Sequence, residues 1–161
     1  MASTRQCTIQ FENSSEYTLR NPSVYMYSGF CEIPLTPALL PSESGSAVFA
    51  KNPNTMWGCT GVFTYDLHNK STRDYDGKMA VMFSNPYDFS SYSNWFAVGV
   101  FSMNTQCDYS LYDKMYYKEQ MGFARGKAEE FNLTYKSEPV VIRATMTDSY
   151  KPVIKVKVSA E

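Results

Sequence analysis

The stretch of the sequence richest in groups for ligand binding is SNPYDFSSYSNWF (84–96), which carries five aromatic rings in thirteen residues. Ser, Asn, Asp and Pro separate the rings, and these residue types disfavour a continuous helix or strand. Tyr and Trp combine an apolar body with a polar tip, so they suit a boundary between water and an apolar phase. The stretch therefore predicts a loop that forms part of a binding surface.

A second group of rings follows in CDYSLYDKMYYKEQ (107–120). Asp108 is expected to cap the N-terminus of a helix, with Leu111 and Met115 on its apolar side. Tyrosines recur at helical spacing beside them: Tyr109, Tyr112 and Tyr116. Such a stripe usually faces a core, but each phenol hydroxyl needs a hydrogen-bond partner. The sequence predicts a helix whose tyrosine side lines a groove, with a core-facing stripe as the alternative.

Charge and composition exclude several functional classes. A net charge of -1 and a pI near 5.9 lack the basic excess that a nucleic-acid partner requires. No run approaches the roughly 20 apolar residues of a membrane-spanning helix, and MASTRQC has no apolar signal core. We therefore expect a soluble protein, either cytoplasmic or secreted by a non-standard route.

Catalytic and metal chemistry find little support in the sequence. His68 is the single histidine, and a nucleophile with its base is hard to assemble around it. The four cysteines are far apart and form no C-x-x-C pair: Cys7, Cys31, Cys59 and Cys107. This spacing argues against zinc and redox sites, and it favours free, mostly buried thiols. We expect neither an enzyme nor a bound cofactor.

Short segments rich in β-branched and aromatic residues must position these groups. Eight such segments are predicted as strands: 7–13, 23–28, 46–50, 58–67, 78–83, 96–101, 139–146 and 152–159. In the last one, Ile154, Val156 and Val158 alternate with lysines, as in a half-buried strand. The segments predict a mainly β fold in one domain, residues 1–161. Its architecture is a two-sheet β-sandwich of eight or more strands with at least one short helix.

The sequence MAVMFSNPYDFSSYSNWFAVGVF (79–101), followed by LYDKMYY (111–117), resembles the membrane-recognition half of the actinoporins. These are pore-forming cytolysins of sea anemones, with relatives in fish, molluscs and plants. The family pattern is a strand ending in F-S-x-P-Y-D-Y, a Y-S-N-W loop and a helix ending in Y-x-x-x-Y-Y. YMYSG and GVFTYD also fit, so the resemblance covers Arg5 to Val158. It implies a β-sandwich flanked by helices.

The resemblance also implies a phosphocholine pocket. The corresponding positions here are Ser28, Thr60, Ser84, Pro86, Tyr92, Tyr112, Tyr116 and Tyr117. Around it, the aromatic belt of the family corresponds to Tyr87, Phe89 and Trp95, with a buried structural role as the alternative for Trp95. The chemistry agrees, because ring faces hold a quaternary ammonium and hydroxyls donate to a phosphate.

Several positions depart from the family pattern. Thr60 replaces an apolar residue, Ser91 replaces a Trp that enters the bilayer, and Lys127 interrupts a frequent R-G-D. Actinoporins also carry a pore-lining amphipathic segment before the first strand, whereas only MASTRQ precedes CTIQF here. Six residues form about 9 Å of helix against about 30 Å of hydrocarbon. We therefore expect membrane binding without the family's route to a pore.

Two functions follow as expectations. The first is recognition of choline phospholipids, sphingomyelin above all, at a membrane surface, where the family also implies self-oligomerisation. The second is a lectin-like carbohydrate-binding module, because fungal fruit-body lectins share this sandwich and bind glycans. Aromatic faces beside Ser, Asn and Asp serve sugars as well as choline.

Overall fold

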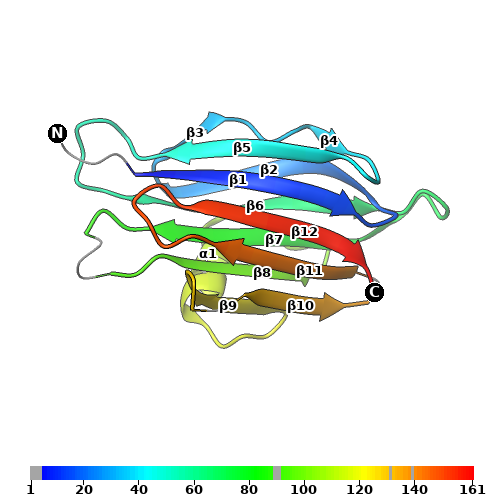
Figure 1. Ribbon diagram of the computed structural model, residues 1–161. Coiled ribbons are helices and arrows are strands. Elements are labelled where there is room, and N and C mark those ends of the chain that lie inside the picture. The colour runs from blue at the N-terminus through cyan, green and yellow to red at the C-terminus, as the bar shows by residue number, and fades with distance from the viewer. Residues whose placement is uncertain (1–4, 89–91, 131, 139) are drawn as a thin grey trace.

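Two six-stranded sheets face each other in the computed structural model, which describes residues 5–88, 92–130, 132–138 and 140–161 (Figure 1). Sheet A has the order β10 (Leu133–Ser137), β11 (Val140–Met146), β12 (Val153–Ala160), β1 (Gln6–Ser14), β5 (Ser44–Ala50) and β3 (Phe30–Ile33). Sheet B has the order β4 (Ala38–Leu39), β2 (Thr18–Ser28), β6 (Cys59–His68), β7 (Tyr75–Asn85), β8 (Trp95–Phe101) and β9 (Phe123–Lys127). Neighbouring strands are antiparallel except β1 and β12, which are parallel.

The main hydrophobic core fills the space between the sheets. Phe11 and Phe49 of sheet A meet Phe63 and Phe83 of sheet B, and the Phe49 and Phe83 ring centroids lie 4.7 Å apart. Along β1, core residues alternate with exposed ones, as the pleat of a half-buried strand requires. β6 differs, because nine of its ten residues are buried. Both faces of sheet B are therefore covered around β6.

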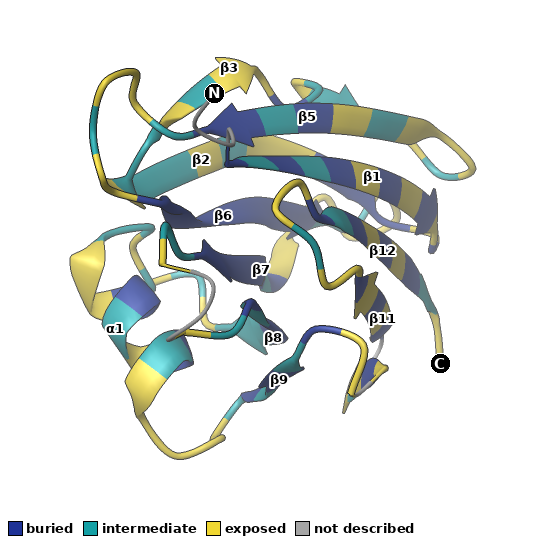
Figure 2. Cartoon of the chain, turned by 60° about the vertical axis from the view of Figure 1, so that its left-hand side comes forward, coloured by how far each residue is buried: buried dark blue, intermediate teal, exposed yellow. Residues whose placement is uncertain are grey.

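The single helix of the described residues, α1 (Tyr109–Tyr117), covers the outer face of sheet B. Leu111 and Met115 are buried there against the small or slender side chains Val62, Ala80 and Ala97. Small residues on the strands let the helix approach the sheet closely. In Figure 2, α1 accordingly lies beside β7, β8 and β9, with buried and exposed residues on its opposite sides.

The predicted fold class is confirmed: two sheets form a β-sandwich with a short helix. All eight predicted strands are present, and the helix begins after Asp108 as expected. Four strands were not predicted, β3, β4, β9 and β10, and each lies at an edge of a sheet. Among the described residues, no helix is long and apolar enough to cross a membrane.

All four cysteines are free thiols, as predicted, although only two are fully buried. Cys7 and Cys59 lie in the main core, whereas Cys31 and Cys107 are partly exposed. Burial raises the pKa of the Cys59 thiol to about 12 and raises the pKa of Cys7 well above its usual value. These two thiols therefore remain protonated at neutral pH.

We predict that Cys7 and Cys59 do not react with Ellman's reagent in the native protein at pH 8. The thiolate is the reactive form, and a raised pKa lowers its population at any given pH. Cys31 and Cys107 should react first, and all four thiols should react in denaturant. The Cys31→Ser, Cys107→Ser double variant is the control, since it should show almost no native reaction. Fast native reaction in that variant would contradict the assignment.

Candidate functional site

Three hydroxyl side chains from adjacent strands form a row on the outer face of sheet B. Ser28 of β2 pairs with Thr60 of β6, which pairs with Ser84 of β7. The Ser28 Oγ and Thr60 Oγ1 atoms are 2.9 Å apart, within hydrogen-bond distance. Thr60 and Ser84 are buried, while Ser28 is partly exposed. The sheet register therefore brings together three predicted site residues that are up to 56 positions apart in sequence.

The Tyr112 hydroxyl reaches this row from α1. It lies beside the side chains of Thr60 and Ser84, and the residue is only 2% exposed. Burial raises the pKa of Tyr112 well above its usual value, although these two neighbouring hydroxyls act to lower it. Tyr112 is therefore a neutral phenol that joins the helix to the sheet.

Tyrosine rings extend outward from Tyr112 and form a continuous aromatic surface. Tyr112 stacks on Tyr27 at 5.2 Å between centroids and contacts Tyr116 at 5.7 Å. Tyr116 in turn contacts Tyr117 at 4.5 Å, and Tyr117 is 66% exposed. We call the connected rings the tyrosine cluster: Tyr25, Tyr27, Tyr109, Tyr112, Tyr116 and Tyr117.

Tyr25 and Tyr27 of β2 were not predicted as site residues from the sequence. Tyr27 is 55% exposed, and its ring is nearly parallel to that of Tyr112, with an angle of 8° between them. The available signal was the alternation Tyr25-Met26-Tyr27 directly before Ser28. Alternate residues of a strand share a face, so both tyrosines had to lie on the same side of the sheet.

The ends of α1 are fixed by hydrogen bonds that hold its tyrosines in place. At the N-terminus, the Asp108 side chain accepts from the Leu111 backbone N–H. At the C-terminus, the Arg125 guanidinium of β9 donates to the carbonyl oxygens of Met115 and Lys118, at 3.0 and 2.8 Å. These bonds satisfy backbone groups that a helix leaves unpaired, so Tyr116 and Tyr117 sit on an anchored last turn.

The loop after β7 is held from a different direction. Arg5 is buried and donates to the carbonyl oxygens of Pro86 and Tyr87. Its guanidinium also lies over the rings of Tyr87 and Tyr150, 5.1 and 4.4 Å from their centroids. Pro86 and Tyr87 are thus attached to the start of β1 rather than to α1.

The other predicted aromatic residues differ in setting. Trp95 pairs with Ser84 across the sheet, is partly buried, and has the Lys127 ammonium 5.6 Å from its ring. Tyr92 is 61% exposed. Among the described residues, the rings of Tyr87 and Tyr92 make no ring contact with the tyrosine cluster. Phe89, also predicted for the belt, lies outside the described residues.

The chemistry of this arrangement suits a ligand with a cation and an anion close together. Ring faces attract a quaternary ammonium, and the hydroxyls of Ser28 and the tyrosines are donors for a phosphate. Across the described ranges, no three His, Cys, Asp or Glu side chains gather as they would to bind a metal ion.

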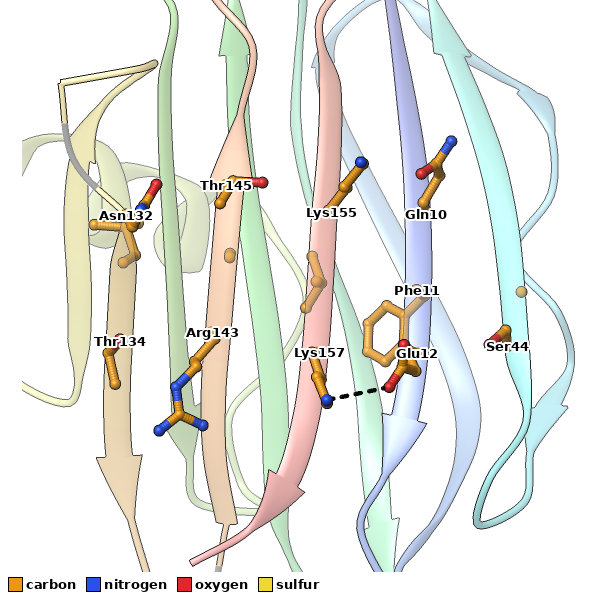
Figure 3. A pocket seen from close by; sticks show the side chains of 14 residues that line it. Gln10, Phe11, Glu12, Ser44, Asn132, Thr134, Arg143, Thr145, Lys155 and Lys157 are labelled. Carbon is orange, nitrogen blue, oxygen red and sulfur yellow. Dashed lines mark ion pairs between the residues drawn. The ribbon is translucent and has the colours of Figure 1, made fainter.

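A separate groove of about 680 Å³ lies on the outer face of sheet A, across β10, β11, β12, β1 and the start of β5 (Figure 3). Its side chains include the ion pair of Glu12 with Lys157, at 3.4 Å, and the guanidinium of Arg143. These polar residues alternate with buried ones such as Phe11 and Val156, which is typical of a solvated sheet face. None of the predicted site residues lines it.

Comparison with known proteins gives a consistent result. The family model described as sea anemone cytotoxic protein matches residues 2–160. Tereporin-Ca1 of Terebra anilis is 30% identical over 164 residues, covering 93% of this chain and 82% of the tereporin. Bryoporin of Physcomitrium patens is 30% identical over 112 residues, which span 70% of this chain but only 60% of the bryoporin. DELTA-actitoxin-Aas1a of Anthopleura asiatica is 34% identical over 117 residues, 70% of this chain and 51% of the toxin.

Among solved structures, the lipid binding protein Nakanori shares the fold. It superimposes with a TM-score of 0.74 at 12% sequence identity, over 98% of this chain and 72% of Nakanori. At this identity the likeness concerns the fold alone.

We predict that Tyr112→Phe lowers the free energy of unfolding by about 1 kcal/mol, because it removes the buried hydroxyl beside Thr60 and Ser84 while the stacked ring remains. Tyr109→Phe is the matched control; its exposed hydroxyl should change stability by less than about 0.5 kcal/mol. Urea unfolding measures both. Equal stability of Tyr112→Phe and the wild type would show that this hydroxyl does not join α1 to the sheet.

Proposed function

Because this chain belongs to the sea anemone cytotoxic protein family, the actinoporins, we propose that it binds the phosphocholine headgroup of choline phospholipids, sphingomyelin above all, through the tyrosine cluster and the adjoining hydroxyl row. Membrane-binding cytolysis characterises this family. The headgroup specificity and the residues that carry it are our proposal for this chain.

The observation that carries the proposal is the continuity of exposed rings and hydroxyls. Tyr27 and Tyr116 both contact the Tyr112 ring, and Tyr117 contacts Tyr116. The strand register shifts between Met26 and Ser28, so Ser28 pairs with Thr60 beside these rings. The trimethylammonium would rest on these faces, each worth about 0.5 to 2 kcal/mol depending on desolvation. The phosphate would then accept from Ser28 and the phenols.

Access to the inner part of the site is more restricted. Thr60 and Ser84 are buried, and the buried Tyr112 hydroxyl lies beside them. A headgroup can meet Tyr117 and Ser28 without rearrangement, but it reaches Thr60 and Ser84 only if the Tyr112 ring moves. The outer rings and Ser28 therefore form the first contact surface of the proposed site, and the inner hydroxyls stabilise Tyr112 in the free protein.

The aromatic loop would add contact with the bilayer beside the headgroup site. Pro86, Tyr87, Tyr92, Trp95 and Phe89 are the residues we propose for it. Tyrosine and tryptophan are enriched at the level of lipid headgroups, where their apolar bodies and polar tips are both satisfied. Nakanori, which shares the fold, is a lipid binding protein, and this is in line with such a role. We also propose that molecules bound at the membrane self-associate.

We predict that the double variant Tyr116→Leu, Tyr117→Leu binds sphingomyelin-containing vesicles at least tenfold more weakly than the wild type. Leucine preserves the helix and apolar area but removes two ring faces, and a loss of about 1.4 kcal/mol corresponds to a factor of ten. Sedimentation with vesicles measures the affinity.

The control for this experiment is Tyr75→Leu, an exposed tyrosine at the far end of β7 from Ser84. It should bind like the wild type. Unchanged vesicle binding by the folded double variant would remove the tyrosine cluster as the headgroup site. Selective capture of glycans by the wild type would instead favour the lectin-like alternative.

We further propose that residues 1–161 alone recognise membranes without permeabilising them. The nine residues of α1, the single helix of the described residues, span about 14 Å against about 30 Å of hydrocarbon. Vesicles loaded with a quenched dye should therefore bind this chain and release no dye. Release at concentrations that merely saturate binding would show that another stretch inserts.

A further inference from the structure

The loop between β5 and β6 presents two large apolar side chains to solvent. In KNPNTMWG (51–58), Met56 is 78% exposed and Trp57 is 65% exposed. Trp57 is one of only two tryptophans, and the other, Trp95, is partly buried. Neither Met56 nor Trp57 belongs to the site described above. A single exposed apolar residue is common on protein surfaces, whereas two large adjacent ones indicate a binding surface.

The base of this loop is packed between the two parts of the proposed membrane-binding site. On one side, Gly29 follows Ser28, and a Cβ at Gly29 would collide with the Ala50 carbonyl oxygen. On the other side, a Cβ at Gly58 would collide with the Asn85 carbonyl oxygen and lie 2.9 Å from the Tyr87 nitrogen. Only glycine permits both approaches, so Trp57 is held next to the start of the aromatic loop.

Further contacts order the loop and supply positive charge beside it. The Lys51 backbone N–H donates to the Arg5 carbonyl oxygen at 3.0 Å, and the Lys51 ammonium lies 5.5 Å from the centre of the Tyr87 ring. The Thr55 hydroxyl donates to the Asn52 carbonyl oxygen at 2.9 Å, which closes the turn before Met56. Two apolar side chains thus stand on an ordered loop, with a cation at its base.

We propose that Met56 and Trp57 form a second membrane anchor, which enters the interfacial layer of the bilayer while the tyrosine cluster holds a headgroup. This inference rests on the proposed function, and it adds a contact with different chemistry. An indole with one polar N–H suits the interface, and methionine is flexible enough to fit among acyl chains. The Lys51 ammonium, at the base of the loop, would then lie at the depth of the lipid phosphates, which attract a positive charge.

A bilayer fits this loop better than a protein partner does, because the loop shares one end of the sandwich with the headgroup site. A membrane that contacts Tyr117, Ser28 and Tyr87 lies at the same end as Trp57. The anchor and the tyrosine cluster are also expected to contribute differently to membrane binding. The tyrosine cluster would select the headgroup, whereas Met56 and Trp57 would add affinity for any fluid bilayer.

The test compares Trp57→Ala with the wild type on vesicles of phosphatidylcholine alone and of phosphatidylcholine with sphingomyelin. We expect the variant to bind both about tenfold more weakly, with the preference between them and the affinity for soluble phosphocholine unchanged. Met121→Ala is the matched control, since Met121 is exposed to a similar extent, at 71%, on the segment after α1. It should bind like the wild type.

Fluorescence gives an independent readout. Vesicles with brominated acyl chains should quench the wild type, and Trp57→Phe should lose the part of the quenched signal that comes from Trp57, so that only the quenching of Trp95 remains. If the wild type binds vesicles, Trp57→Ala binds them equally tightly and no quenching depends on Trp57, the anchor is overturned but the headgroup site is not. Absence of any wild-type vesicle binding would overturn the proposed function and the anchor together. A weaker affinity of Trp57→Ala for soluble phosphocholine would place Trp57 in the headgroup site and also overturn the anchor.

Discussion

The candidate site depends on the contact between one buried phenol and the outer face of sheet B. The buried hydroxyl of Tyr112 lies beside Thr60 and Ser84, while its ring stacks on Tyr27. Because a buried hydroxyl away from other polar groups is costly, the helix has one favourable position on the sheet. That position determines where Tyr116 and Tyr117 reach the surface. The exposed aromatic surface therefore depends on a buried contact that lies beneath the residues a ligand would meet first.

The sandwich in turn makes this contact available. β6 is buried on both faces, with Phe63 in the main core and Val62 beneath α1, so the hydroxyls of β2, β6 and β7 are held at fixed register. The loops at one end of the sheets then gather around that row. Arg5 holds the loop after β7 and Gly58 allows the β5–β6 loop to pack against it, which places aromatic residues from distant parts of the chain at one end of the fold. Rigid strands and short, packed loops are what a preorganised binding surface requires.

Much of the fold was predictable from sequence because the central strands must bury alternate or continuous apolar residues. The strands that escaped prediction are the four edges, such as FARGK in β9, where one side of the strand has no partner and charged residues are tolerated. The hydroxyl and tyrosine residues of the pocket were reached by resemblance to a family, whereas Tyr25 and Tyr27 required the strand register to be combined with the helix position. Trp57 carried no pattern at all in the sequence. Its meaning depends on exposure and on the neighbours of Gly58, which only three-dimensional structure supplies.

The most direct test of headgroup recognition by the tyrosine cluster is a crystal structure of the protein soaked with millimolar phosphocholine. We expect the trimethylammonium within about 6 Å of the ring centroids of Tyr116 and Tyr117, and the phosphate within hydrogen-bond distance of Ser28. Phosphocholine bound instead in the groove of sheet A, beside Arg143 and Lys155, with the tyrosine cluster empty, would contradict this expectation.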